Sequence, residues 1–412
     1  MFSLKKKVLI IFLLALALRV IWIATLNNNV DVWGDWWDEL GWRLATGQGF
    51  WVQNPWFSQE APFYAWRSPG FPFLLSLVYR IFGHSFLAAK IVLAILNSGA
   101  AVLLYLLGRM LIGEKGGTAS GLIYAFYPTA IFFTGYFAPD NLFTILLLAA
   151  VLFLVLAEKT GKRHLFLWAG IFLGAGVLSR SLFLLLLPVI CGWLFIRNRK
   201  VAVSGTLIVS LGCLLVMVPW VIRNYRMCHN FILTSTEGGI VCYIANNSHS
   251  LSEPSGYWNP DNDVTEHLAG MSEVQADHYL YREAFHFIRN NPAEYSRLVA
   301  DRFTRFWRLY PHTFSGPGEA YTRRHVIIAF LTMTPIFAAF FAGLWLSFRR
   351  WRDFLLFYLI IIVWSLPVIL FFKTVLRYRE AIMPYIILFA AYAFSAAVSR
   401  ERCAKVKTGA KI

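Results

Sequence analysis

Apolar residues dominate the chain in long, nearly uninterrupted runs. A helix that crosses a bilayer needs about 20 mainly apolar residues, and the sequence predicts ten such helices. They cover roughly residues 8–26, 86–108, 118–135, 141–157, 165–179, 181–196, 201–221, 325–347, 354–372 and 381–398. The pattern therefore predicts an all-α polytopic membrane protein.

Two shorter stretches have the pattern of helices that lie at the membrane surface. Residues 35–46 place Trp36, Trp37, Leu40 and Leu44 at helical spacing, and glycines end the run. Residues 69–83 are apolar but short and open with prolines. Trp-rich amphipathic helices lie flat at the interface, so we expect two interfacial or re-entrant helices here.

The charges then orient the chain. With the N-terminus in the cytoplasm and alternating spans, the cytoplasmic pieces hold 19 of the 38 basic residues but four of the 22 acidic ones. That difference accounts for +15 of the formal net charge of +16. An excess of Lys and Arg marks the cytoplasmic side. We therefore expect a plasma (inner) membrane protein with both termini in the cytoplasm, and the positive charge does not indicate nucleic-acid binding.

This topology predicts three regions. An N-terminal membrane domain, 1–221, includes an acidic first outer loop, 27–85. An extracytoplasmic segment, 222–324, follows, and residues 325–412 hold the last helices and a basic cytoplasmic tail.

The outer segment is predicted to be a small mixed α/β unit. Gly238 and Gly239 separate two apolar runs, which indicates a hairpin. Residues 274–309 have the pattern of one or two helices, with an aromatic stripe that we expect to pack on the membrane domain.

Composition narrows the class of protein further. The chain is 58% hydrophobic and 15% charged, whereas soluble domains are about 25% charged. Five cysteines in 412 residues exclude a disulfide scaffold. Cys228 and Cys242 both lie in the outer segment, and a disulfide between them is left open.

Charged residues recur at the outer ends of the predicted helices. The first outer loop carries Asp31, Asp35, Asp38 and Glu39, and later helix ends carry Asp140, Arg180, Arg377 and Arg379. Any one of these charges is explained by a side chain that snorkels to the headgroups. Carboxylates and arginines together at one depth suit a substrate with a phosphate and a hydroxyl nucleophile.

The order of motifs resembles a known family. LATGQGF at 44–50, RSPGFPFLL at 67–75, GRML at 108–111 and YPTAIFFTGYFAPDNLF at 127–143 precede GAGVLSR at 174–180, PWVIRNY at 219–225, TSTEGG at 234–239 and RYREAIMP at 377–384. The chain resembles the GT-C glycosyltransferases of the dolichyl-phosphate-mannose protein mannosyltransferase type. That group includes bacterial polyprenyl-phosphate-sugar transferases such as the lipid A aminoarabinose transferase-like enzymes of the cell envelope.

The resemblance implies a GT-C fold and a sugar transferred, with inversion, from a polyprenyl-phosphate donor to an acceptor hydroxyl on the extracytoplasmic side. It implies a general base in the first outer loop, for which Asp35 is the candidate and Asp38 and Asp31 are alternates. It also implies a second acid, Asp140, and basic residues at the lipid phosphate: Arg180, Arg377, Arg379 and Arg67.

Other readings stay open at this stage. A flippase of lipid-linked sugars should show ionisable residues near the midplane, and an O-antigen-ligase-like polymerase would rely on arginines rather than first-loop acids. No Walker or Rossmann motif indicates a nucleotide. No ligand spacing indicates a metal site, and a divalent cation at the donor phosphate is left open. The sugar, the acceptor (glycan, lipid or protein) and the oligomeric state are not indicated.

Overall fold

The computed structural model describes residues 3–28, 36–55, 61–251, 262–311, 322–372 and 374–407. In these ranges the chain is helical, and the paired extended backbone is a single antiparallel bridge between Val52 and Phe63. Asp31 and Asp35 lie outside the described residues, and Asp38 lies within them.

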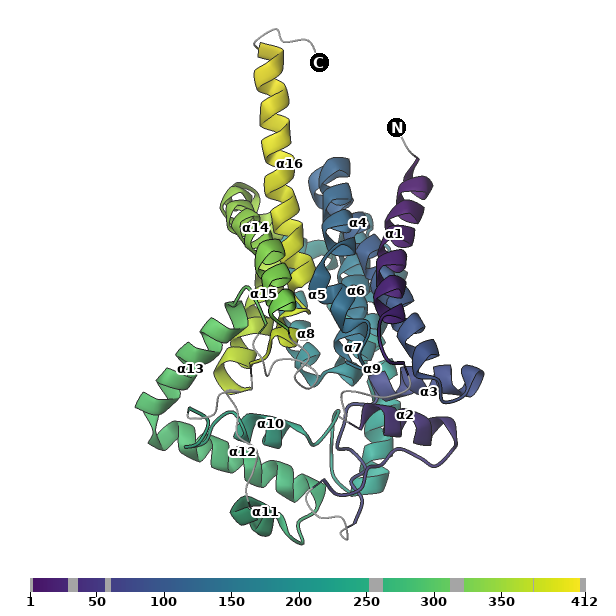
Figure 1. Ribbon diagram of the computed structural model, residues 1–412, viewed down its shortest axis with the longest axis vertical. Helices are drawn as coiled ribbons and strands as arrows, with labels where there is room; N and C mark the ends of the chain where they lie inside the picture. Colours follow the sequence, from purple (N-terminus) through teal and green to yellow (C-terminus); the bar gives the residue numbers. More distant parts are fainter. Residues whose placement is uncertain are drawn as a thin grey trace.

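The helices follow one another along the chain as labelled in Figure 1. Three short 3-10 turns, η1 (Ser181–Leu185), η2 (Phe348–Arg350) and η3 (Leu376–Arg379), join some of them. The α-helices are α1 (Leu4–Ala24), α2 (Trp37–Ala45), α3 (Gly70–Phe82), α4 (Phe86–Ala125), α5 (Pro128–Phe133), α6 (Asp140–Thr160), α7 (Arg163–Ser179), α8 (Leu186–Arg197), α9 (Arg199–Cys228), α10 (Gly238–Tyr243), α11 (Asn262–Leu268), α12 (Glu273–Asn290), α13 (Pro292–Trp307), α14 (Arg323–Ser347), α15 (Trp351–Phe371) and α16 (Met383–Lys407).

Five helical stretches in the described part of the chain are long and apolar enough to cross a membrane: Leu4–Ala24, Phe86–Ala125, Asp140–Thr160, Arg199–Cys228 and Arg323–Phe371. The multi-pass membrane prediction is confirmed, but the number of ten spans is not. Shorter apolar helices, including α7 and α16, cover other predicted spans. The predicted interfacial stretches form α2 and α3.

One long stretch contains two antiparallel helices. α4 is interrupted at Gly113, whose φ of 83° and ψ of 179° suit glycine and not a helix interior. Beyond this point the chain folds back on itself. The two halves then lie in contact, as shown by Gly117, where an added Cβ would lie 2.6 Å from the backbone N of Arg109. The predicted spans 86–108 and 118–135 thus meet at this turn.

The second of those predicted spans is shorter than expected. Its helix ends at Ala125, and α5 begins at Pro128. The residue before a proline is disfavoured in the helical conformation, and Tyr127 is extended, with ψ 111°. This break places Tyr127 between two helices.

The predicted cytoplasmic pieces gather at one end of the bundle. Lys7 Nζ lies 2.6 Å from Glu114 Oε1, and Arg197 NH1 lies 2.8 Å from Asp353 Oδ1. Lys159 Nζ donates to the Met110 carbonyl at 3.0 Å. Both ends of the chain lie toward this end, whereas α2, α10, α11 and α12 lie at the opposite end (Figure 1).

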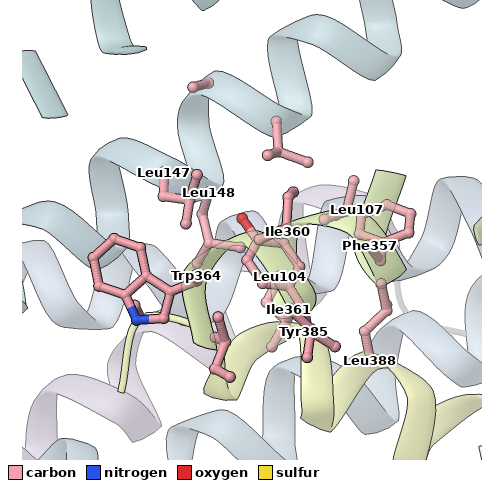
Figure 2. Packing of buried hydrophobic residues seen from close by; sticks show 14 of the residues in the cluster. Leu104, Leu107, Leu147, Leu148, Phe357, Ile360, Ile361, Trp364, Tyr385 and Leu388 are labelled. Carbon is pink, nitrogen blue, oxygen red and sulfur yellow. The ribbon is translucent and has the colours of Figure 1, made fainter. Parts of the chain in front are cut away.

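Close contacts between small residues and large apolar side chains hold the bundle together. α7 and α9 pack so tightly that a Cβ on Gly170 would lie 2.2 Å from the Val209 carbonyl oxygen. Small residues allow this approach in membrane helices. Figure 2 shows part of the core, where Leu104, Leu147, Trp364 and other buried side chains from α4, α6, α15 and α16 interlock.

The described residues of the outer segment form helices and no strand, rather than the predicted mixed α/β unit. The predicted hairpin at Gly238 and Gly239 is wrong, because these residues begin α10. Their lack of side chains serves packing, since a Cβ on Gly239 would lie 2.2 Å from the Asp277 carbonyl oxygen of α12. The predicted helical stretch 274–309 forms two helices, α12 and α13, and Pro292 starts the second.

The cysteines of the outer segment are not paired with each other. Cys228 and Cys242 are both free, and Cys242 is buried. The Cys228 thiol instead lies 2.9 Å from Glu273 Oε1. Glu273 also accepts the backbone N–H of Ala65 at 2.9 Å, so this buried carboxylate joins the first outer loop to α12.

Candidate active site

Asp140 stands at the start of α6 with 2% of its surface exposed. Pro139 precedes it, so the helix begins abruptly and presents this carboxylate at its positive N-terminal end. Oδ1 lies 2.8 Å from Arg180 NH2. Oδ2 is buried with no hydrogen-bond partner among the described residues, which leaves one acceptor available to a bound group.

Arg180 follows the last residue of α7, where the backbone turns extended with φ −152° and ψ 120°. Besides Asp140, its guanidinium carbon lies 4.6 Å from the centre of the Tyr378 ring. Its Nε is buried and lacks a hydrogen-bond partner in the described part of the chain. Such a donor, beside a carboxylate and over an aromatic face, suits a phosphate oxygen.

Arg377 reaches the same tyrosine from the η3 turn. Its guanidinium carbon lies 5.4 Å from the Tyr378 ring centre. Trp364 Nε1 donates to the Tyr378 carbonyl at 2.6 Å and so fixes the turn on α15. The structure therefore brings together Asp140, Arg180 and Arg377, which lie far apart in the sequence. We call these three residues with Tyr378 the tyrosine cluster.

Arg379, two residues further along, is engaged elsewhere. It is fully buried, and its NH1 donates to the carbonyls of Phe306 at 2.9 Å and Arg308 at 2.6 Å. These carbonyls end α13, where a cation satisfies otherwise unpaired acceptors. The contacts of Arg379 thus connect η3 to the outer segment.

Arg67 is ion-paired with Glu237. Its guanidinium carbon lies 5.5, 5.1 and 5.8 Å from the ring centres of Trp36, Trp37 and Trp66. This pair joins the RSPG and TSTEGG motifs, although Arg67 and Glu237 are 170 residues apart in the sequence. The arrangement fixes the first outer loop beside α10.

Asp38, an alternate for the base, is held at the junction of α2 and α3. It accepts a hydrogen bond from the Tyr79 hydroxyl, and its two oxygens lie 2.9 and 3.0 Å from His84 Nε2. His84 in turn stacks on Trp42 with ring centres 4.6 Å apart. Both oxygens of Asp38 therefore have partners already.

Sequence reasoning missed two buried groups near the tyrosine cluster. Glu380 is 6% exposed, and its Oε1 accepts a hydrogen bond of 2.8 Å from the Tyr127 hydroxyl. Both residues stand within motifs that the sequence showed, YPTAIFF and RYREAIMP. The available signal was a carboxyl that directly follows two arginines, Arg377 and Arg379, but the same pattern also indicates a local ion pair.

A second missed feature is a chain of buried hydrogen bonds that supports the start of α6. Arg19 Nε donates to Asn97 Oδ1 at 2.8 Å, and Asn97 Nδ2 donates to Asn141 Oδ1 at 3.2 Å. Arg19 NH1 also donates to the Ala125 carbonyl at 3.1 Å. This chain ties α1, α4 and α6 together next to Asp140.

An apolar cavity of about 570 Å³ lies beside the cluster, between α2, α3, α6, α7 and α9. Its lining includes Leu142 and Ser179, which are two residues and one residue from Asp140 and Arg180. Phe73 and Leu77 of α3 also line it, although 57% and 44% of their surfaces are exposed. The cavity is thus open along α3, on the outside of the bundle.

No group of three or more His, Cys, Asp or Glu side chains among the described residues is placed to hold a metal ion. Asp140 Oδ2, an acceptor, and Arg180 Nε, a donor, lack a hydrogen-bond partner among the described residues. A ligand that offers a hydroxyl to the acceptor and an anionic oxygen to the donor suits this pair better than a cation does.

Part of the sequence matches a known family. Residues 66–222 match the sequence family described as dolichyl-phosphate-mannose-protein mannosyltransferase. This region contains Arg67, Asp140, Arg180 and most of the lining of the apolar cavity. No sequence among the curated proteins matches the chain.

Solved structures resemble the whole chain. The apo oligosaccharyltransferase of Archaeoglobus fulgidus matches with a TM-score of 0.62 at 14% identity, over 99% of this chain and 52% of that one. The same archaeal enzyme, AglB, with an inhibitory peptide and a dolichol-phosphate matches with a TM-score of 0.60 at 14% identity, again over 99% and 52%. ArnT from Cupriavidus metallidurans bound to undecaprenyl phosphate matches with a TM-score of 0.50 at 15% identity, over 95% and 60%.

The chain spans about half the length of the oligosaccharyltransferase chains that it matches. The chain shares the fold of these oligosaccharyltransferase and ArnT structures, and its residues 66–222 match the mannosyltransferase family.

Proposed function

We propose that this protein is an integral-membrane glycosyltransferase that moves a sugar from a polyprenyl-phosphate donor to an acceptor hydroxyl. Transfer takes place on the extracytoplasmic face and inverts the anomeric carbon. The observation that carries the proposal is the apolar cavity that opens along α3 and adjoins Asp140 and Arg180. An amphiphile with a long apolar tail and one phosphate matches both parts of this site.

The donor class has independent support. AglB and ArnT, which share the fold, have structures with dolichol-phosphate and undecaprenyl phosphate. In this chain the tail would lie in the cavity while the phosphate contacts Arg180 and Arg377. Guanidinium groups bind phosphate oxygens in a fixed two-pronged geometry, and both lie on the Tyr378 ring.

The proposed reaction needs few chemical groups. The acceptor oxygen forms a bond to the anomeric carbon as the bond from that carbon to the phosphate oxygen breaks. The acceptor proton passes to a first-loop carboxylate, for which Asp35 is our candidate. The electron pair of the broken bond stays on the polyprenyl phosphate, where the arginines stabilise its charge. No step is assigned to a divalent cation.

The orientation is also part of the proposal. The end of the bundle that holds Lys7, Lys159 and Arg197 should face the cytoplasm, because basic residues are retained there. A reporter fused after Lys200 is expected to be cytoplasmic, and one fused near Asn262 external. Both reporters on the same side would contradict the alternation of spans.

Filling the apolar cavity should block the donor. Ala175 of α7 lines the cavity. In Ala175→Trp the indole would occupy part of this volume and displace at least two methylene groups of the lipid tail. At about 0.8 kcal/mol each, the apparent donor KM should rise about tenfold. Transfer can be followed with a radiolabelled sugar on undecaprenyl phosphate in detergent, and the tail located with a photoreactive undecaprenyl phosphate that should label α3 or α7.

The matched control is Ala338→Trp on α14, an exposed alanine outside the cavity. It should leave both the KM and the labelling unchanged. Labelling that Ala175→Trp does not reduce would place the tail elsewhere. Movement of lipid-linked sugar across vesicles without transfer would favour a flippase.

A further inference from the structure

Arg302 is a buried arginine of α13 that the proposed reaction does not use. Only 1% of its surface is exposed, and its acceptors among the described residues are neutral oxygens. NH1 donates to the Leu370 carbonyl at the end of α15, at 2.6 Å. NH2 donates to the Ala245 carbonyl and, at 2.9 Å, to Asn246 Oδ1, just after α10. Carbonyl ends of helices stabilise a cation, so Arg302 joins the ends of α10 and α15 to α13.

The last turn of α15 is completed by side chains of the outer segment. The Leu370 carbonyl also accepts a hydrogen bond of 3.2 Å from the Tyr295 hydroxyl of α13. The Phe371 carbonyl accepts one of 2.8 Å from Asn246 Nδ2. The final carbonyls of a helix have no partner within that helix. The place where α15 ends therefore depends on Arg302 and these two neighbours.

The chain that follows α15 returns to the same outer helix. In η3, Arg379 NH1 donates to the carbonyls of Phe306 at 2.9 Å and Arg308 at 2.6 Å, where α13 ends. Phe306 stands one turn after Arg302 on α13. The stretch between these two anchors carries Arg377 of the tyrosine cluster. It is thus fastened to α13 at both ends.

The anchors affect the tyrosine cluster because Arg180 is held elsewhere. Arg180 follows α7 and is ion-paired with Asp140 of α6, so its position is set by the membrane helices. The guanidinium carbons of Arg180 and Arg377 lie 4.6 and 5.4 Å from the centre of the Tyr378 ring. A phosphate that contacts both groups needs a fixed separation between them. A shift in the end of α15 would move Arg377 relative to Arg180.

We infer that Arg302 is a positioning residue for the donor phosphate: by binding the ends of α10 and α15 together, it fixes the turn that carries Arg377. The inference rests on the proposed function, in which Arg180 and Arg377 bind that phosphate. Arg302 itself makes no contact with substrate. Through α13, the outer segment therefore contributes to the affinity for donor.

The test is Arg302→Lys, which keeps the charge and most of the volume of the side chain. A lysine ammonium is a point charge, so it cannot bind the ends of α10 and α15 at the same time as the two-pronged guanidinium does. The donor KM, measured with undecaprenyl-phosphate sugar in detergent, should rise roughly tenfold. The value of kcat at saturating donor should stay within roughly twofold of the wild type, since the reacting groups are unchanged.

This division between KM and kcat separates positioning from a merely structural role. Loss of stability alone would reduce the amount of active protein, and with it the apparent kcat, without moving the KM. The matched control is Arg297→Lys, the same change at an exposed position of α13, which should leave both values unchanged.

A milder variant keeps the test open if Arg302→Lys does not fold. Tyr295→Phe removes one hydrogen bond to the Leu370 carbonyl and leaves Arg302 in place. It should raise the donor KM roughly twofold to threefold, in the same direction as Arg302→Lys. An unchanged KM in Tyr295→Phe and in any Arg302→Lys protein that folds would overturn the inference.

Double variants identify the group through which Arg302 acts. Added to Arg377→Lys, Arg302→Lys should raise the KM little further, because the contact that it positions is already impaired. Added to Ala175→Trp, which acts on the lipid tail, the two increases in KM should multiply. Increases that multiply in both backgrounds would contradict an action through Arg377.

The outcomes also separate the inference from the proposed function. If Arg302→Lys lowers kcat but leaves the KM and the labelling by photoreactive undecaprenyl phosphate unchanged, the inference is wrong while transfer itself stands. If the wild type neither binds undecaprenyl phosphate nor transfers sugar, the proposed function is wrong and the inference fails with it.

Discussion

Replacing Asp35 with asparagine is expected to lower kcat by roughly 10²–10⁴-fold, the usual contribution of a general base. The argument rests on the first-loop acids that the structure describes. Asp38 already binds Tyr79 and His84, and Glu39 is ion-paired with Arg43 at 2.7 Å. Of the loop acids considered, this leaves Asp35, with Asp31 as alternate, for the acceptor proton.

Asp38→Asn is the matched control, since it makes the same change three residues away. It weakens the contact with His84 and should lower stability by about 1 kcal/mol while kcat stays within a few-fold of the wild type. Single-turnover transfer and thermal unfolding in detergent measure the two effects. Loss of activity in Asp38→Asn but not in Asp35→Asn would assign the base to Asp38. Full activity in both would contradict a first-loop base.

Replacing Arg180 with lysine is expected to raise the donor KM by roughly 10- to 100-fold. Hydrogen bonds to a charged group contribute about 1.5–3 kcal/mol. Arg180 uses NH2 for Asp140 and has Nε without a partner among the described residues, so it can bind carboxylate and phosphate together. A lysine ammonium is a point charge and cannot reproduce this planar arrangement. Arg377→Lys should have a similar effect.

The measurement is the donor KM in detergent, where anchoring to lipid headgroups no longer contributes. Arg282→Lys is the control, because Arg282 lies on the outer helix α12 with 71% of its side chain exposed. It should leave the KM unchanged. Unchanged values for Arg180→Lys and Arg377→Lys would show that these arginines only snorkel to the interface.

The sequence by itself determined the helices and the distribution of charge along them. Each apolar run corresponds to helix over most of its length, because a run of apolar residues can be buried in lipid only if its backbone bonds internally. Alternating spans also fix which charged residues share a side of the membrane. Lys7, Lys159 and Arg197 could therefore be assigned to one end of the bundle before any contact was known. Motif order was enough to identify the fold.

Tertiary structure alone decided which of the charged helix ends meet. Arg377 and Arg379 are two residues apart in one motif, yet one lies against Tyr378 and the other binds the end of α13. Gly238 and Gly239 have the pattern of a turn in the sequence, but they begin α10. Their lack of side chains is explained by α12, which approaches too closely to leave room for a Cβ. Local sequence determines whether a segment is helical, but a polar group finds its partner only when helices distant in sequence pack, and that packing brought Glu380 to Tyr127.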